Sequence, residues 1–367
     1  MKFKMQREQM LRALQLVTSV VERRQTLPVL ANILVVATED RLEITGTDLE
    51  VQLVASCDAT VEQPGAATMP ARKLADIWRS LGDGSEVQVS IEKDRALVRS
   101  GRSRFTLATL PAADFPKIDV GEADTRLSIS QNDLRTIIDE VGFAMAQQDV
   151  RYFLNGMLLE ATPSHVRAVA TDGHRLAMST CEVSAMETGA GKSVIVPRKG
   201  VLELGRLLEG VDEKVALQIG DNHLQACVGT FTLTTKLVDG QFPDYQKVVP
   251  SGSSRSLVAD RETLRQAFQR ASILSNEKYR GVRLIIDGDQ LVIQANNPEQ
   301  EEAEETVSVE FAGTTLEIGF NVSYLLDVLG SLTTDAVKLS VSDANSSALL
   351  EGVGNDSALY VVMPMRL

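Results

Sequence analysis

The sequence predicts an α+β protein of three similar domains, each with two helices packed on antiparallel sheets. Residues 105–110, closed by Phe115-Pro116, recur as residues 231–235 with Phe242-Pro243, in the same order and at nearly the same spacing. Each third of the chain also repeats one succession of apolar patterns, first helical and then alternating. Recurrence over so long a period indicates duplication of a whole domain.

Each domain is expected to begin with a short strand and an amphipathic helix. In the first domain, Leu11, Leu14 and Val17 follow the helical spacing. Ser130 and Asp260 are suitable N-caps for the corresponding helices of the second and third domains. A Leu-Arg pair recurs in these helices, at positions 11–12, 134–135 and 264–265.

Alternating β-rich runs follow each helix and predict paired strands. The three pairs are residues 33–36 with 42–45, 156–159 with 166–170, and 281–286 with 291–294. Asp287-Gly288 is a hairpin signal between the last two runs. The second strand of each pair ends in a polar turn, at Thr47-Asp48, Thr171-Asp172 and Asn296-Asn297.

A second helix then appears in each domain, and we expect Pro70 and Pro197 just inside the first two. Residues 321–329 form the third counterpart, and runs such as 86–91, 95–100 and 104–109 predict closing strands. Each domain thus reads as strand, helix and three strands, twice over. The pattern lapses near residues 119–125 and 249–255, which predicts domains at 1–123, 126–248 and 255–367.

The net charge of −13 argues against a nucleic-acid partner when it is taken alone, because phosphate binding depends on Lys and Arg. DNA stays possible if the 37 basic residues gather on one surface. Negative charge could be held apart from such a surface by a cluster of glutamates at positions 299, 301, 302, 304 and 305. The alternative for that cluster is a solvated loop or edge strand.

The composition is that of a cytoplasmic protein. The N-terminus has no apolar signal segment, and no apolar run approaches the length of a membrane span. Cys57, Cys181 and Cys227 are scattered and never form a C-x-x-C pair. This pattern favours a reducing compartment and argues against disulfides and zinc.

Enzymatic chemistry has weak support. Residues 189–193 (Gly-Ala-Gly-Lys-Ser) resemble the end of a phosphate-binding loop, but Met186 stands where such a loop needs glycine and a strand-like run follows. Asp172 and His174 are the one local group suited to acid–base work, and no nucleophile stands near them. We therefore expect no catalytic residue, no cofactor and no metal site.

Basic pairs occupy equivalent positions before two of the second helices, as Arg72-Lys73 and Arg198-Lys199. One such pair usually marks a solvated face. The same pair in two repeats suggests a shared basic surface suited to sequence-independent phosphate contact.

Longer motifs occur in order along the whole chain, including residues 171–176 (Thr-Asp-Gly-His-Arg-Leu), 196–200 (Val-Pro-Arg-Lys-Gly), 296–302 (Asn-Asn-Pro-Glu-Gln-Glu-Glu) and 363–367 (Met-Pro-Met-Arg-Leu). With them the chain resembles the bacterial sliding clamps, the beta subunits of DNA polymerase III. The resemblance implies three clamp-type domains in a head-to-tail homodimeric ring around double-stranded DNA. It implies a non-catalytic processivity factor that binds DNA independently of sequence.

The resemblance also implies residues for two interfaces. The DNA-facing residues would be Arg24, Arg72, Gln148, Tyr152, Arg198, Lys199 and Arg206. The dimer contacts would be Lys73, Phe105 and Leu107 at one end of the chain, with Ile273 and Leu274 at the other. A head-to-tail contact of this kind makes a closed ring when its rotation closes.

The resemblance further implies a hydrophobic pocket for short peptides of the polymerase III catalytic subunit, the clamp loader, other polymerases and mismatch-repair proteins. Its residues would be Leu154, Thr171, Gly173, His174, Arg175, Leu176, Pro243, Val248, Asn321, Tyr324, Val361, Val362, Met363, Pro364, Met365 and Arg366. The alternative for the tail is a last strand and its packing. Tyr279 and Gln246-Lys247 depart from residues common in the family, so the polarity of the pocket rim is expected to differ.

Overall fold

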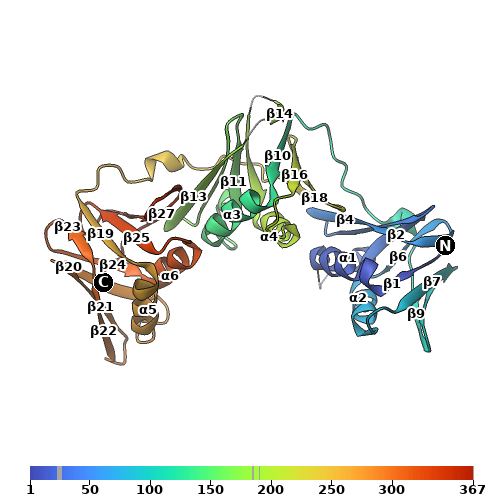
Figure 1. Ribbon diagram of the computed structural model, residues 1–367, viewed down its shortest axis with the longest axis horizontal. Helices are drawn as coiled ribbons and strands as arrows, with labels where there is room; N and C mark the ends of the chain where they lie inside the picture. Colours follow the sequence, from blue (N-terminus) through green and yellow to red (C-terminus); the bar gives the residue numbers. More distant parts are fainter. Residues whose placement is uncertain (23–26, 184–185, 190, 367) are drawn as a thin grey trace. The chain divides into compact units, whose positions relative to one another are not determined.

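The computed structural model describes residues 1–22, 27–183, 186–189 and 191–366, with the backbone alone at 186 and 187. Within these residues the predicted order of strand, helix and three strands occurs twice in each of three repeats (Figure 1). The repeats run from β1 to β9, from β10 to β18 and from β19 to β27. Each also has one short strand that the sequence did not indicate, namely β5 (Thr60–Gln63), β14 (Met186–Thr188) and β23 (Glu310–Ala312).

The first repeat packs helices α1 (Arg7–Val20) and α2 (Ala71–Ser80) side by side against its sheets. Leu14 and Val17 are buried as predicted, whereas Leu11 is partly exposed because α1 starts early enough for Met10 to lead the buried stripe. The strands are β1 (Lys2–Gln6), β2 (Asn32–Thr38), β3 (Arg41–Thr47), β4 (Val51–Asp58), β6 (Gly65–Pro70), β7 (Glu86–Glu92), β8 (Arg95–Ser100) and β9 (Ser103–Ala108).

The central repeat has helices α3 (Gln131–Val141) and α4 (Arg198–Leu207). The Ser130 hydroxyl accepts a hydrogen bond from the Asp133 amide at 3.0 Å, as expected of an N-cap. The strands are β10 (Thr125–Ser130), β11 (Gly156–Ala161), β12 (His165–Thr171), β13 (Arg175–Glu182), β15 (Lys192–Pro197), β16 (Lys214–Ile219), β17 (His223–Val228) and β18 (Phe231–Lys236).

The third repeat has helices α5 (Arg261–Ser272) and α6 (Val322–Ser331), capped by Asp260 and Asn321. The predicted hairpin at Asp287-Gly288 is confirmed, since Asp287 pairs with Gln290. The strands are β19 (Arg255–Asp260), β20 (Gly281–Asp287), β21 (Gln290–Asn296), β22 (Glu302–Ser308), β24 (Leu316–Asn321), β25 (Ala336–Val341), β26 (Ala348–Gly352) and β27 (Asn355–Val362).

Pro70 and Pro197 lie one residue before their helices, so the expectation that they sit just inside was wrong. Each is the last residue of a strand, β6 or β15, at the end of its sheet. An edge strand tolerates proline because the missing N–H leaves no ladder hydrogen bond unmade.

The chain divides into two compact units, which do not follow the repeat boundaries. The first comprises Met1–Arg135, Ala185–Lys192 and Lys199–Leu237, and the second comprises Thr136–Ser184, Ser193–Arg198 and Val238–Leu367. The strands and helices of the central repeat are therefore shared between both units.

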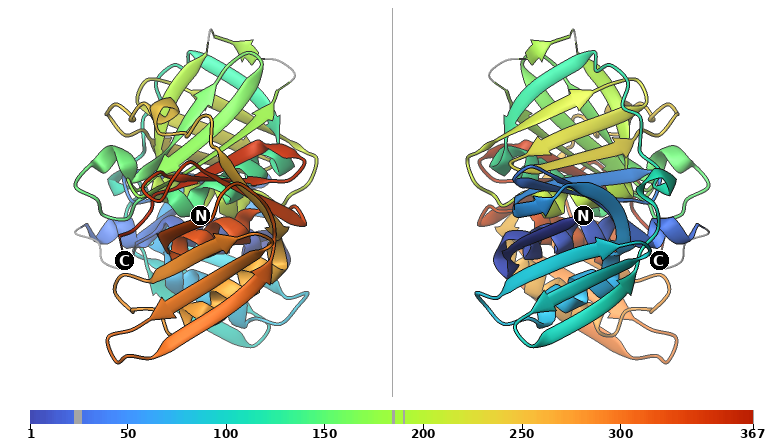
Figure 2. Two further views of the ribbon diagram at one scale, coloured as in Figure 1. Left: turned by 90° about the vertical axis from the view of Figure 1, so that its left-hand side faces the viewer. Right: turned by 90° about the vertical axis from the view of Figure 1, so that its right-hand side faces the viewer.

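The first unit contains a five-stranded sheet, β5-β1-β7-β8-β9, and a nine-stranded sheet, β14-β10-β16-β17-β18-β4-β3-β2-β6. In the right view of Figure 2 the strands β7, β8 and β9 lie side by side in teal. Helix α1 packs closely on the larger sheet at Gly46, where a Cβ atom would lie 2.6 Å from the Val17 carbonyl oxygen.

The second unit contains a nine-stranded sheet, β15-β11-β12-β13-β27-β26-β25-β19-β23, and a four-stranded sheet, β22-β21-β20-β24. In each unit the nine-stranded sheet joins two repeats through one antiparallel pair of strands. The pair is β4 with β18 in the first unit and β13 with β27 in the second. We call these two places the first seam and the second seam.

Candidate functional site

An apolar cavity of about 180 Å³ opens beside the second seam. Most of its lining is apolar, which suits a hydrophobic peptide side chain. The lining residues are Arg151, Leu154, Thr171, Gly173, His174, Arg175, Leu176, Pro243, Tyr245, Val248, Val361 and Met363. All of these except Arg151 and Tyr245 were predicted from the sequence.

The floor of this pocket belongs to the core of the second unit. Leu176 and Val361 face each other across the pairing of β13 with β27, and both are almost fully buried. Tyr245 packs against them and donates a hydrogen bond to Glu160 at 2.7 Å. Burial, followed by the Glu160 carboxylate, raises the pKa of Tyr245, so the phenol keeps its proton.

The rim is a turn, residues 171–175, between β12 and β13. The Thr171 hydroxyl donates to the Arg175 carbonyl at 2.6 Å and accepts from the Gly173 amide at 3.1 Å. Asp172 Oδ1 accepts from the amides of His174 and Arg175. Gly173 has φ +89, and a Cβ there would lie 2.9 Å from the Arg151 guanidinium, so the turn requires glycine.

Arg175 connects this turn to two other parts of the unit, the segment after α3 and helix α6. Its Nε donates to Asp172 Oδ2 at 3.1 Å, and another nitrogen donates to the Phe143 carbonyl at 2.9 Å. It also pairs with Asp327 on α6. The guanidinium lies 4.6 Å from the ring centre of Tyr324, within range of a cation–π contact. Arg175 thus fixes the pocket rim to the helices around it.

Arg151 forms the other basic side of the pocket. It pairs with Asp149 through Nε at 3.0 Å and a terminal nitrogen at 2.8 Å, and contacts the Asp172 carbonyl at 3.3 Å. The Arg151 hydrogen bond is the main cause that lowers the pKa of Asp149 to about 2. The signal that could have identified Arg151 is the close pairing of Asp149 and Arg151 in a turn that leads to the predicted Leu154.

The C-terminal tail forms one edge of the pocket through Met363. Its amide donates to the His174 carbonyl at 2.9 Å, and the side chain is exposed. The Met365 amide donates to the Gly319 carbonyl at 2.8 Å. This bond holds the tail after Met363 against β24. The alternative that the tail is only a last strand is wrong at Met363, which lines the cavity.

Six predicted pocket residues do not line this cavity. Val362 is buried because strand alternation turns it to the face opposite Val361. Asn321 caps α6, and Tyr324 stacks on the His174 ring at a centroid distance of 6.5 Å. The others are Pro364, Met365 and Arg366, which follow Met363 in the tail.

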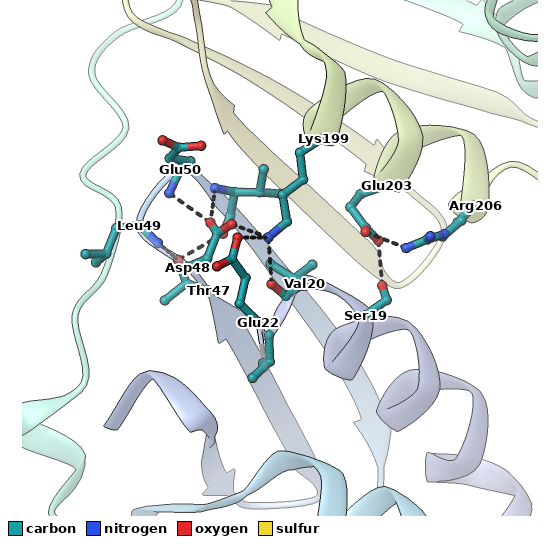
Figure 3. Close-up of polar contacts among 12 residues, drawn as sticks. Ser19, Val20, Glu22, Thr47, Asp48, Leu49, Glu50, Lys199, Glu203 and Arg206 are labelled. Atoms are coloured by element: carbon teal, nitrogen blue, oxygen red, sulfur yellow. Dashed lines mark hydrogen bonds and ion pairs between the residues drawn. The ribbon is translucent and has the colours of Figure 1, made fainter. Parts of the chain in front are cut away.

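Three residues predicted to face DNA lie in the first unit, and two of them are engaged by acids (Figure 3). Lys199 pairs with Asp48 and Glu22, and Arg206 pairs with Glu203. The Asp48 side chain is only 4 % exposed, whereas that of Lys199 is 28 % exposed. Arg72 is exposed and donates to the Val21 carbonyl at 3.3 Å.

In the second unit, Gln148 and Tyr152 are exposed, and Gln148 has φ +57. Arg198 is partly exposed and donates to the Met145 carbonyl at 3.1 Å. Arg24 lies outside the residues that the structure describes.

The predicted dimer contacts lie at two places. Lys73 is exposed at the start of α2, and β9 carries Phe105, which is partly exposed, and Leu107, which is nearly buried. Ile273 is 76 % exposed immediately after α5, and Leu274 is partly exposed beside it.

Residues 189–193, which resemble the end of a phosphate-binding loop, include a lysine that is paired with two carboxylates. Lys192 begins strand β15 and pairs with Asp124 and Asp221, both at 2.8 Å. A phosphate-binding loop would instead lead into a helix. Ala190 of the same stretch lies outside the described residues.

The described part of the chain lacks two features, a metal-binding cluster and a membrane-spanning helix. It has no group of three or more His, Cys, Asp or Glu side chains placed to hold a metal ion. It also has no helix that combines the length and the apolar character needed to cross a bilayer.

Three family models match the chain in order. They describe the N-terminal, central and C-terminal domains of the DNA polymerase III beta subunit, and they match residues 1–119, 128–244 and 246–366. The chain belongs to this family. The resemblance noted in the sequence is confirmed, as are the three similar α+β domains and the sliding-clamp function.

Beta subunits from other bacteria are similar over their full length. The beta sliding clamp of Pseudomonas putida is 56% identical over 369 residues, covering 100% of both chains. That of Escherichia coli K12 is 51% identical over 369 residues, again with 100% of both covered. A crystal structure of the Pseudomonas aeruginosa beta subunit bound to griselimycin matches with a TM-score of 0.97 and 55% identity, covering 100% of both chains.

Proposed function

We propose that two copies of this chain close head to tail into a ring around double-stranded DNA and tether the replicative polymerase without catalysing a reaction. The observation that carries this proposal is the ordered match of three beta-subunit domains over the chain. Its partners would be DNA of any sequence, the polymerase III catalytic subunit, the clamp loader, other polymerases and mismatch-repair proteins, in the cytoplasm. We assign the domains to residues 1–123, 126–248 and 255–367.

Ring closure follows from the seams. At each seam the last strand of one repeat pairs with a strand of the repeat before it. The pairs are β18 with β4 and β27 with β13. In both pairs the earlier strand, β4 or β13, comes directly before the short extra strand of its repeat. The equivalent strands left over are β22 of the third repeat and β9 of the first. Both are terminal strands of their sheets among the described residues. Pairing of β22 with β9 of a second copy would continue the same rule and close a ring.

Charge and apolar exposure favour this pairing. Strand β22 carries the exposed side chains of Glu302 and Glu304, whereas Arg104 lies on β9 and Arg102 just before it, both exposed. Opposite charges on two strand edges steer them together and fix their register. Ile273 follows α5, which packs on β22, and would bury its exposed side chain in the contact.

Charge reversal tests the arrangement in solution. Arg104→Glu and Glu304→Arg should each weaken the dimer, because two like-charged contacts then occur per ring. An equimolar mixture of the two variants should restore it, because one interface regains the original pair and the other has the reversed pair. Sedimentation velocity at micromolar concentration measures this. A mixture that stays as monomeric as either variant would contradict head-to-tail pairing through β9 and β22.

For the inner surface we propose Arg24, Arg72, Gln148, Tyr152 and Arg198 as DNA-facing residues. Lys199 and Arg206 were expected there too, but both side chains are engaged by carboxylates. The topological model predicts that the ring, loaded on circular DNA, slides off once the DNA is cut. Retention of the protein on the linear product would refute it. The charge-reversed variants Arg72→Glu and Arg198→Glu separate this clamp from a peptide scaffold, which they would leave unaffected.

For the pocket beside the second seam we propose short apolar peptides of the polymerase and the other partners as ligands. Griselimycin, with which the Pseudomonas aeruginosa relative was crystallised, is a suitable probe. Removal of residues 363–367 should abolish binding of griselimycin and of a polymerase C-terminal peptide in calorimetry. The dimer should persist, since the amides of Met363 and Met365 bond to His174 and Gly319 and not to β9 or β22 among the described residues. Unchanged affinity in the shortened chain would overturn the pocket assignment.

A further inference from the structure

The two seams carry the same turn. At the first seam the Thr47 hydroxyl donates to the Val51 carbonyl at 2.9 Å, as Thr171 does to Arg175 at the second. Asp48 Oδ1 accepts from the Val51 amide at 2.7 Å, as Asp172 does from Arg175 at 3.0 Å. The region around the first turn is therefore the counterpart, in the first unit, of the pocket rim.

The strand that follows each turn continues the likeness. The Lys236 amide donates to the Glu50 carbonyl at 2.9 Å, as the Met363 amide does to the His174 carbonyl at the same distance. Lys236 is the last residue of β18 and Met363 follows directly after β27, so in both places the end of the last strand of the following repeat lies beside the turn.

Each seam also has one cation that bridges the turn to the end of a helix. At the second seam, Arg175 joins Asp172 Oδ2 to the Phe143 carbonyl, just after α3. At the first, Lys199 joins Asp48 Oδ2 to the Val20 carbonyl at the end of α1 (Figure 3).

The source of the cation differs between the seams. Arg175 is part of the turn itself and lies along the pocket wall. Lys199 comes from α4 and reaches across to the turn, so its side chain spans the first seam (Figure 3). The position of α6 equivalent to Lys199 is Ser323, which is too short to do this. At the second seam α6 instead reaches the turn through Tyr324 and Asp327, and a cavity remains beside the turn.

The floors differ in polarity. Leu176 and Val361 face each other under the pocket, whereas the equivalent pair at the first seam is Gln52 and Thr234. The side-chain oxygen Oε1 of Gln52 accepts from the Ile118 amide at 3.1 Å, and the Thr234 hydroxyl accepts from the Gln225 side chain at 3.2 Å. A floor made of these polar side chains gives an apolar peptide less apolar surface to bury than Leu176 and Val361 do.

We propose that the first seam is a closed counterpart of the pocket, and that Lys199, Gln52 and Thr234 restrict peptide binding to one site per chain. The inference deepens the proposed function and rests on it for the identity of the ligand. It assigns Lys199 a positioning role at the seam in place of a contact with DNA.

Calorimetry with griselimycin on the full dimer tests the stoichiometry. The unaltered chain should bind one molecule per chain, and the chain without residues 363–367 should bind none. In that shortened background, Lys199→Ser with Gln52→Leu and Thr234→Val should restore one site per chain, at least tenfold weaker than the original. A residual site in the shortened chain, or no site in the folded triple variant, would overturn the proposal.

Hydrogen exchange decides on the Lys199 bridge without any ligand. Lys199→Ser should speed exchange of the amides in residues 47–51 about tenfold or more. The matched control Lys214→Ser, an exposed lysine on β16, should leave them unchanged. Equal exchange in both variants would refute the bridge. Absence of griselimycin binding by the unaltered chain would instead count against the proposed pocket, while the exchange result still stands for Lys199.

Discussion

Replacing Arg175 by methionine keeps much of the apolar stem and removes the guanidinium that holds the pocket rim. In the folded chain that group has three partners, Asp172, Asp327 and the Phe143 carbonyl, and lies over two aromatic rings. The side chain is 12% exposed and that of Asp172 is 19% exposed, so both charges are largely withdrawn from water.

The expected cost is set by what the substitution leaves behind. Removing one partner of a buried ion pair costs about 3–5 kcal/mol, because the other charge stays buried. Asp172 keeps hydrogen bonds from two backbone amides, which places the loss near the lower end. The aromatic contacts add about 0.5–1 kcal/mol each. We expect Arg175→Met to destabilise the second unit by about 4 kcal/mol.

Arg151→Met is the matched control in the same pocket. The Arg151 side chain is 49% exposed and its pair with Asp149 lies near the surface. Exposed pairs contribute roughly 0–1 kcal/mol, so the control should lose no more than that.

The assay must report on the second unit alone. Trp78 is the only tryptophan and lies in the first unit, so its fluorescence does not follow the pocket. Hydrogen exchange of the β13 and β27 amides in increasing urea gives the free energy of opening at the second seam. A loss below about 1 kcal/mol for Arg175→Met, or equal losses for the two variants, would refute a bridging role based on burial.

Substitutions at Glu140, at Arg72 and Lys199, and at Gly173 test three other parts of the structure. Burial raises the pKa of Glu140 above its ordinary value of 4.5, so the folded chain holds this proton more tightly than the unfolded chain. Stability should therefore fall as pH rises from 4.5 through the folded pKa, and Glu140→Gln should raise the melting temperature at pH 7 and flatten this dependence. In salt titrations of DNA affinity, Arg72→Met should reduce the slope by about one, whereas Lys199→Met should leave it unchanged. Gly173→Ala places alanine in a left-handed conformation, which costs ~1–2 kcal/mol, and brings its Cβ against Arg151. The pocket rim should shift as a result, so griselimycin should bind at least about tenfold more weakly.

The regular elements could be predicted because their signals are local. Helical spacing, N-caps such as Asp260 and the hairpin at Asp287-Gly288 each depend on residues within a few positions of one another. The short strands β5, β14 and β23 gave no such signal. A run of three or four residues has no measurable periodicity, and only its neighbour in the sheet makes it a strand.

The pocket shows where sequence reasoning stops. Residues of the motif around Thr171–Leu176 line one cavity together with Met363 of the tail. Whether Val362 or Val361 faces the cavity depends on the register of β27 against β13, which no local pattern fixes. The ion pair of Lys199 could not be predicted from the sequence either, because its partner Asp48 belongs to another repeat.

The strands β4 and β9, both labelled in Figure 1, have a further consequence for isolated repeats. A fragment that ends with the first domain would carry β9 and would lack β18, the partner of β4. Both β4 and β9 would then be edge strands with unpaired backbone groups. We expect such a fragment to associate with further copies of itself, since both strands are free to pair with a separate molecule. For a ring with a fixed number of repeats, the number of chains is set by how many repeats each chain contains.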